Sequence, residues 1–287
     1  MKIFFLMNPS RQRGLRNFRA QASQTAQRQN HAAYFGEVDR RAPDAMAHLL
    51  DQAVEKGCTR IIALGGDGTY NRLIRLLAAK QLLETMEIGL IPGGTCNDFL
   101  RRWRFSPLRP GEALRFACGG QAIATDLGEL NGELFLNNAG FGRRVSTAPR
   151  RKVDAFRSMR QFEAVPLRAR WDQGHIEGLF YMGLVCNSPY FSKGLYFSKA
   201  VAIDDGRLDI FLVPKMPKTK LAALLLLGRL GRPLRTRQLV TLRLERLVIE
   251  SERDLWPQVD GEPAGAEPAR ELRFCISKLK ALIVRPV

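Results

Sequence analysis

Up to about residue 122, short apolar runs alternate with longer segments whose apolar residues recur every three or four positions. Residues 44–56 show the longer pattern, which places Met46 and Leu50 on one side of a predicted helix. Strands that alternate with helices are typical of a parallel sheet with crossover helices. The predicted strands are residues 2–7, 32–38, 60–64 and 87–91, and the predicted helices are residues 15–29, 44–56 and 70–80.

After about residue 122 the pattern changes to strand-like runs joined by turn dipeptides such as Asn131-Gly132 and Asp205-Gly206. This predicts a β-rich second domain, residues 123–287, with one inserted helix near residues 218–230. The first domain is then residues 1–122, an α/β domain to which the C-terminal segment is a candidate addition. The predicted strands of the second domain are residues 122–127, 134–139, 167–171, 175–186, 207–213, 240–250 and 270–274, with one more near the C-terminus.

Composition is that of a globular protein, with 45% hydrophobic and 25% charged residues among 287. The formal net charge is +17, which predicts an anionic partner: nucleic acid, phospholipid head groups or phosphorylated substrates. Residues 143–170 hold nine basic and two acidic side chains, and residues 215–237 hold seven basic and none acidic. These stretches indicate either a basic binding face or a solvated surface.

Cysteine and histidine usage argues against a disulfide framework and against a zinc site. The five cysteines form no CxxC pair, and the three histidines have no metal-ligand spacing. We therefore expect a reducing compartment. The apolar run near the N-terminus is shorter than a signal sequence needs, and residues 221–227 are far shorter than the roughly 20 of a membrane span. The expected protein is soluble or lies on a membrane surface.

The most informative motif is GGDGTYN at residues 65–71, directly after a predicted strand and before a predicted helix. Its three glycines permit a close approach of backbone to phosphate and positive φ angles. Consecutive N–H groups at a helix N-terminus form an anion site, and Asp67 suits Mg²⁺ or a bound water. An ordinary tight turn is the alternative, although such a turn needs only one glycine.

A second glycine turn follows the next predicted strand, where residues 92–99 read PGGTCNDF. Gly93, Gly94 and Thr95 suit a phosphate or ribose at the carboxyl end of a parallel strand. Asn97 and Asp98 are alternatively N-caps of the next helix. The P-loop, protein-kinase and G-x-S-x-G motifs are absent.

These two turns, together with DGEP at residues 260–263, resemble the motifs of the diacylglycerol kinase catalytic-domain family. The chain is most similar to the bacterial soluble lipid kinases, and more distantly to sphingosine and ceramide kinases. The resemblance covers nearly the whole chain, with further motifs at residues 8–9, 126–128, 135–142 and 204–209. It implies an α/β domain like those of NAD kinases and phosphofructokinases, followed by a β-sandwich, with the site between them.

The resemblance also assigns roles to individual residues. Glu262 is implied as the general base on the acceptor hydroxyl, with Asp67 and Asp126 as acidic members of a Mg²⁺-linked network. The implied nucleotide-binding residues are Asn8, Pro9, Gly14, Asp39, Gly65, Gly66, Asp67, Gly68, Thr69, Tyr70, Asn71, Gly94 and Thr95. A structural Mg²⁺ is implied at the Asp205 carboxylate and the carbonyl groups of Ala202 and Arg207.

The sequence departs from the family pattern at several of its positions. Asp39 stands where the family usually has threonine, and arginines occupy much of the first loop. Arg143-Arg144 stand where an acidic residue is common, and Ser192-Lys193-Gly194 stand where a run of glycines is usual. The last two departures lie where the acceptor would bind, so the identity of the lipid stays open.

The resulting expectation is an ATP- and Mg²⁺-dependent lipid kinase that phosphorylates a membrane lipid such as diacylglycerol. It would be cytoplasmic and peripheral at the inner membrane face, with anionic membrane as a partner. The alternatives are an NAD kinase-like enzyme and a non-catalytic basic protein that binds membrane or nucleic acid. Preference for ATP over GTP and the oligomeric state, a homodimer included, stay open, as does whether residues 221–227 form a core helix or enter the membrane interface.

Overall fold

The computed structural model describes residues 1–8, 15–39, 41–42, 44–103, 110–142, 163–191, 194–196, 198, 201–232 and 239–285. The chain forms two compact units. Unit 1 is Met1–Thr125 with Lys278–Val287, and unit 2 is Asp126–Ser277. Two strands, β5 (Gln121–Leu130) and β16 (Ala269–Arg285), contain residues of both units.

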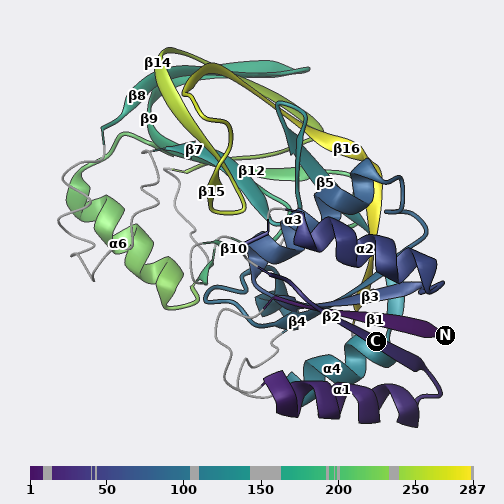
Figure 1. The fold of residues 1–287 in the computed structure, drawn as a ribbon. Helices are drawn as coiled ribbons and strands as arrows, with labels where there is room; N and C mark the ends of the chain where they lie inside the picture. The colour runs from purple at the N-terminus through teal and green to yellow at the C-terminus, as the bar shows by residue number, and fades with distance from the viewer. Residues whose placement is uncertain are drawn as a thin grey trace. The chain divides into compact units, whose positions relative to one another are not determined.

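Unit 1 is built on a parallel sheet with the strand order β16-β4-β3-β1-β2 (Figure 1). Strands β1 and β3 are buried on both faces, which explains why their sequences are continuous apolar runs. The register aligns Phe5 with Phe35 on one side and with Ile62 on the other. The strands are β1 (Lys2–Met7), β2 (Ala32–Glu37), β3 (Arg60–Gly65) and β4 (Glu87–Pro92).

Helices cover both faces of this sheet, as Figure 1 shows for α1 and α4 on one face and α2 and α3 on the other. Side chains of β1 alternate between the faces, so that Ile3 and Phe5 join a core cluster with Phe18 of α1 and Leu114 of α4. The helices are α1 (Leu15–Arg28), α2 (Ala45–Glu55), α3 (Asp67–Ala79) and α4 (Pro110–Gly119), with a 3₁₀ helix η1 (Phe99–Trp103).

Unit 2 is antiparallel, with β13, β12, β9, β7, β14 and β16 in that spatial order and β8 paired with both β9 and β14. Its largest core cluster includes Phe135, Phe141, Ile210 and Phe274. The bounds are β6 (Glu133–Phe135), β7 (Asn138–Gly142), β8 (Val165–Trp171), β9 (Gly174–Cys186), β10 (Tyr190–Phe191), β11 (Leu195–Tyr196), β12 (Leu208–Pro214), α6 (Lys218–Arg229), β13 (Val240–Leu244), β14 (Arg246–Val259) and β15 (Glu262–Pro263).

These elements confirm the predicted fold class, an α/β part and a β-rich part, and the helix near residues 218–230. Several predicted boundaries were wrong. Helix α3 begins at Asp67 rather than at residue 70, because Gly66 serves as its N-cap. The predicted strand 134–139 is interrupted between β6 and β7, and the predicted strand 240–250 changes partner at Glu245. The last two predicted strands are one, β16.

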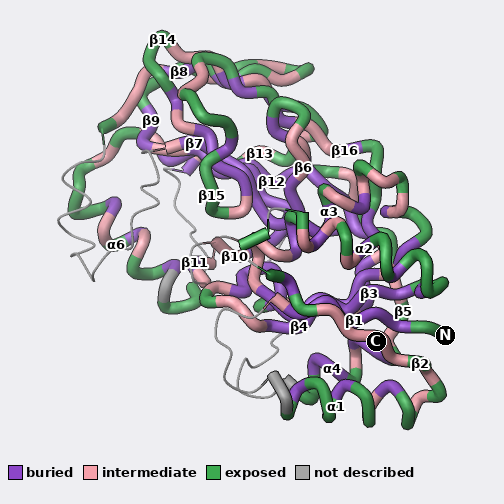
Figure 2. Tube along the Cα trace, viewed as in Figure 1, coloured by how far each residue is buried: buried purple, intermediate pink, exposed green. Residues whose placement is uncertain are grey.

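Among the described residues, no helix combines the length and the apolar character needed to cross a membrane. The buried segments of each unit are mainly its strands, which Figure 2 shows as purple stretches of the chain trace.

A buried arginine joins β3 to the end of α4. Arg60 is 3% exposed, and its guanidinium donates to the carbonyl groups of Ala117, Cys118 and Gly120 and pairs with Glu87. The last carbonyl groups of a helix have no partner within the helix, so the guanidinium satisfies groups that would otherwise be buried without hydrogen bonds.

We predict that Arg60→Met lowers the free energy of unfolding by about 3 kcal/mol, because it leaves buried carbonyl groups without donors. Urea unfolding of the variant measures this loss. The matched control is Arg115→Met at an exposed position of α4, which should change stability by less than about 0.5 kcal/mol. Equal effects of the two substitutions would contradict this role of Arg60.

Candidate functional site

The carboxyl ends of the parallel strands of unit 1 share one edge of the sheet, and most of the implied nucleotide-binding residues follow these ends. Asn8 follows β1, Asp39 lies two residues after β2, Gly66 follows β3 and Gly93 follows β4. Ligands of open α/β sheets bind at this edge. Pro9 and Gly14 lie outside the described residues.

The two glycine turns of unit 1 touch each other through their backbones. The Gly93 N–H donates to the Gly65 carbonyl at 2.7 Å. A Cβ atom on Gly94 would lie 2.4 Å from the Gly66 Cα, closer than any real Cβ contact. The expected positive φ angles are wrong, since Gly66 has φ −110° and the described glycines with positive φ lie elsewhere. The glycines are needed for close backbone approach.

The N-terminus of α3 is half-exposed, and its residues are held from two sides. The Asn8 side chain donates to the Thr69 hydroxyl at 3.0 Å. The Asp67 carboxylate accepts the N–H groups of Asp98 and Phe99 at 3.0 and 3.1 Å, which caps η1. The first N–H groups of α3, at Asp67 and Gly68, have no partner within the helix by its geometry and suit an anion.

Two of the implied nucleotide-binding residues do not present their side chains at this surface. Tyr70 is fully buried, and its hydroxyl lies 2.6 Å from the Gly65 carbonyl and 2.7 Å from that of Ile91. Burial, together with the Asp67 charge, raises the pKa of Tyr70 well above its ordinary value. Asn71 is 6% exposed. The Tyr70 hydroxyl therefore supports the ends of β3 and β4, and a nucleotide contact by either residue stays a prediction.

The second turn is closed by its own asparagine. Asn97 adopts φ 50°, accepts the Gly94 N–H at 3.0 Å and donates to the Gly94 carbonyl at 2.9 Å. Thr95 is exposed beside it. Asp39 is exposed as well, and its carboxylate accepts the Arg41 N–H at 2.9 Å.

In unit 2, Asp126 is 1% exposed and is bound into the loop before β12. Its carboxylate accepts the Gly206 N–H at 2.6 Å, and its own N–H donates to the Ile203 carbonyl at 2.7 Å. The Asn187 side chain donates to the Asp126 carbonyl at 2.6 Å. The acidic residue that the motif predicted is therefore fixed in orientation.

The carboxylate implied for the structural Mg²⁺ has two partners in the structure. The Asp205 carboxylate is ion-paired with Arg243 and also accepts the Arg207 N–H at 3.0 Å. A guanidinium at this carboxylate supplies the positive charge that the ion would bring. Among the described residues, no cluster of three or more carboxylate, thiol or imidazole side chains is placed to hold a metal ion. The implied site at Ala202, Asp205 and Arg207, which consists of one carboxylate and two backbone carbonyl groups, stays a prediction.

Glu262 is exposed at the end of a tight hairpin turn between β14 and β15. Asp260 and Gly261 have φ angles of 48° and 85°, and Val259 pairs with Glu262. Positive φ at both central residues defines the turn type that Asp-Gly favours. The sequence pattern placed Glu262 in a turn correctly.

Asp260, which sequence reasoning missed, anchors this turn. Its carboxylate accepts the N–H groups of Leu136, Asn137 and Asn138 at 3.2, 3.0 and 2.9 Å. Its own N–H donates to the Asn138 carbonyl at 2.8 Å. Carboxylates that accept several backbone N–H groups form strong, directional anchors. The carboxylate therefore fixes the hairpin that carries Glu262, and it occupies the interruption between β6 and β7.

Beside this anchor, polar residues are buried in one row across the sheet. Asn138, Cys186 and Asp209 stand opposite one another on β7, β9 and β12. Burial raises the pKa of Asp209 to about 6 and that of Cys186 well above its ordinary value. Among the described residues, the buried side-chain oxygens without a hydrogen-bond partner include those of Asn137, Asn138, Asn187, Ser188 and Asp209. Water or the polar groups of a ligand would satisfy such atoms.

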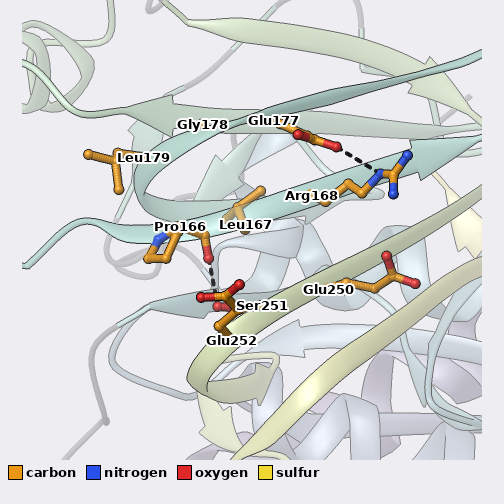
Figure 3. Close-up of a pocket in the computed structure, with 9 residues that line it drawn as sticks. All are labelled: Pro166, Leu167, Arg168, Glu177, Gly178, Leu179, Glu250, Ser251 and Glu252. Atoms are coloured by element: carbon orange, nitrogen blue, oxygen red, sulfur yellow. Dashed lines mark hydrogen bonds and ion pairs between the residues drawn. The ribbon is translucent and has the colours of Figure 1, made fainter.

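A cavity of about 620 Å³ lies elsewhere in unit 2, on β8, β9 and β14, as Figure 3 shows. Its lining includes an Arg168–Glu177 ion pair at 3.0 Å and a hydrogen bond of 2.7 Å from the Ser251 hydroxyl to the Pro166 carbonyl. None of the implied site residues lines it.

Comparison with known families follows the division of the chain. The diacylglycerol kinase catalytic domain matches residues 2–130, and the YegS C-terminal NAD kinase beta sandwich-like domain matches residues 141–282. The chain belongs to the diacylglycerol kinase-like family. The match to the second domain supports the β-sandwich that the resemblance implied for the C-terminal part.

Individual relatives agree with this family. Proteins named diacylglycerol kinase from Staphylococcus aureus strains JH9 and Newman are 29% identical over 240 residues, 78% of this chain and 74% of each relative. Crystal structures of a diacylglycerol kinase and of a putative one from Bacillus anthracis str. Sterne share the fold, with TM-scores of 0.76 and 0.80. They are 19% and 21% identical, and each alignment covers 99% of this chain and 97% of the other.

We predict that Gly94→Ala disrupts the paired turns of this family member, because the new methyl group would overlap the Gly66 Cα. The expected loss is about 2 kcal/mol of unfolding free energy, together with at least a tenfold weaker affinity for a fluorescent ATP analogue. Gly111→Ala is the control, since a Cβ there meets no atom within 4 Å. Unchanged nucleotide affinity in Gly94→Ala would exclude the turns as the binding site.

The raised pKa of Asp209 predicts a specific dependence of stability on pH. Between about pH 4 and pH 6 the folded protein keeps a proton that the unfolded chain has lost, so the free energy of unfolding falls as pH rises. Asp209→Asn removes this dependence and should be about 2 kcal/mol more stable than the natural protein at pH 7.5, but not at pH 4. Urea unfolding at both pH values measures the difference, with the exposed Asp254→Asn as control. A difference independent of pH would contradict the assignment.

Proposed function

We propose that this member of the lipid kinase family is an ATP- and Mg²⁺-dependent kinase that phosphorylates the hydroxyl of a membrane lipid such as diacylglycerol. The observation that carries the proposal is the half-exposed N-terminus of α3, flanked by two glycine turns in backbone contact. The names of the Staphylococcus aureus relatives support the choice of diacylglycerol as acceptor. The position of the enzyme at the inner membrane face is part of the proposal.

The proposed nucleotide site uses the first N–H groups of α3, at Asp67 and Gly68, for the phosphates of ATP. Asn8, hydrogen-bonded to Thr69, borders the same helix end. The Asp67 carboxylate accepts one N–H on each oxygen and retains lone pairs, which fits the oxygen ligands that Mg²⁺ prefers. When bound, Mg²⁺ would neutralise charge on the phosphates.

The proposed acceptor chemistry rests on Glu262. Phosphoryl transfer requires a group that takes the proton of the attacking hydroxyl, and a carboxylate performs this role in kinases. The exposed Glu262 is available to a substrate, and the Asp260 anchor limits the movement of its turn. The buried Asp126, fixed by Gly206, is the second acidic residue of the proposal.

The test measures transfer of labelled γ-phosphate from ATP with Mg²⁺ to a panel of lipids in mixed micelles. Glu262→Gln should lower kcat at least about 100-fold through loss of the base, with little change in unfolding free energy because the side chain is exposed. Asp67→Ala should also abolish the product.

The control is Glu267→Gln, an exposed carboxylate five residues further along the chain, which should keep full activity. Labelled NADP formed from NAD, with no labelled lipid, would overturn the proposal in favour of an NAD kinase-like activity. Full activity of Glu262→Gln would leave a lipid kinase but exclude this residue as its base.

A further inference from the structure

Helix α6 of unit 2 is apolar on two opposite sides. Leu221 and Leu224 are 2% and 3% exposed and belong to a core cluster with residues of β9 and β12. Leu226 and Leu230 are 60% and 67% exposed, although they belong to the same apolar run. The green segments of α6 in Figure 2 mark this outward side.

The exposed leucines share one side of the helix. Leu226, Leu227 and Leu230 are spaced at i, i+1 and i+4, and the exposed Ala223 precedes Leu226 by three positions. We call these four residues the outer α6 face. The inner side packs in the core of unit 2, as the core-helix alternative predicted. The outer side is exposed, so the interfacial alternative stays open for it.

The charged residues that flank the outer α6 face in the sequence are all basic. Lys215, Lys218 and Lys220 are exposed at the start of the helix, and Arg232 is exposed after its end. Residues 215–237 contain no acidic side chain. Lysine and arginine near apolar residues keep their charged ends in water while their stems lie along the apolar surface.

We propose that the outer α6 face docks on an anionic phospholipid bilayer, with its leucines in the boundary between head groups and acyl chains and its basic side chains among the head groups. A helix with exposed leucines and neighbouring lysines matches the interfacial type of membrane binding. The proposal rests on the proposed function, because an enzyme with a membrane lipid as acceptor must reach it at a bilayer.

Charge favours this occupant over two others. A second copy of the chain would bring another basic stretch without acidic residues against the first, and the like charges would repel. A nucleic acid would match the lysines and arginines but would leave the three leucines in water.

The first experiment is sedimentation with vesicles of phosphatidylcholine and phosphatidylglycerol, compared with phosphatidylcholine alone, without ATP. The double substitution Leu226→Ser/Leu230→Ser should lower the partition coefficient at least tenfold. The matched control, Val54→Ser/Leu279→Ser, removes two apolar side chains of unit 1 that are 45% and 39% exposed, and it should change binding less than twofold. Lys220→Gln and Arg232→Gln, at exposed positions, should each weaken binding about fivefold, and raised salt should do the same.

A second experiment reports on insertion directly. Leu227→Trp should show a blue-shifted emission with anionic vesicles and quenching by brominated acyl chains, whereas Leu279→Trp, in unit 1 and 39% exposed, should show neither. Equal vesicle binding by the leucine double variant and the natural protein would overturn the proposal. Concentration-dependent dimerisation that the double variant abolishes, without any vesicle effect, would assign the face to a second copy.

The test separates this proposal from the proposed function. Vesicle binding without ATP needs no catalysis, so binding that depends on the outer α6 face stands even if no lipid is phosphorylated. Conversely, a double variant that phosphorylates a short-chain, water-soluble acceptor at the natural rate, but phosphorylates vesicle lipid slowly, would show that α6 acts in docking. Slow phosphorylation of both acceptors by the double variant would contradict a docking role.

Discussion

The contact between Gly66 and Gly94 is the constraint on which the arrangement of unit 1 depends. A Cβ on either glycine would lie within 2.9 Å of the other's Cα, so any side chain would force the ends of β3 and β4 apart. The buried Tyr70 hydroxyl lies between the Gly65 and Ile91 carbonyl groups and holds the same two strand ends together. The N–H groups at the start of α3 are therefore oriented before a ligand binds, which lowers the cost of binding an anion.

In unit 2 a partly buried set of hydrogen bonds to one carboxylate, that of Asp260, fixes the local backbone, as the glycine contact does in unit 1. The Asp260 carboxylate accepts the N–H groups of Leu136 and Asn137, which lie between β6 and β7, and that of Asn138, the first residue of β7. The same hydrogen bonds therefore join the interruption of the predicted strand 134–139 to the DGEP turn. Asp67 acts in the same way toward η1. Asp67 and Asp260 therefore each orient a segment of the backbone through hydrogen bonds. This structural role is separate from any role in the reaction.

Local patterns predicted the class of fold, because buried parallel strands such as β1 and β3 are continuous apolar runs. They also predicted the two glycine turns that follow buried strands. They could not predict the backbone N–H groups that Asp67 and Asp260 accept, or the ion pair of Asp205 with Arg243, because these partners are distant in sequence. Helix α3 was placed three residues late because glycine and aspartate are poor in helix interiors, yet they are accepted in a first turn. The merging of the last two strands into β16 depends on pairing, which no local pattern contains.

The outer α6 face combines exposed leucines with the positive charge of the residues around it. Three exposed leucines on one helix favour association with other apolar surfaces, and the surrounding lysines and arginines oppose association between copies of the same chain. An anionic bilayer reverses only the second effect, because its charge attracts the basic side chains while its acyl region accepts the leucines. The same residues can therefore keep the protein dispersed in water and bring it to a membrane, which is the combination that an enzyme with a soluble nucleotide and a lipid acceptor requires.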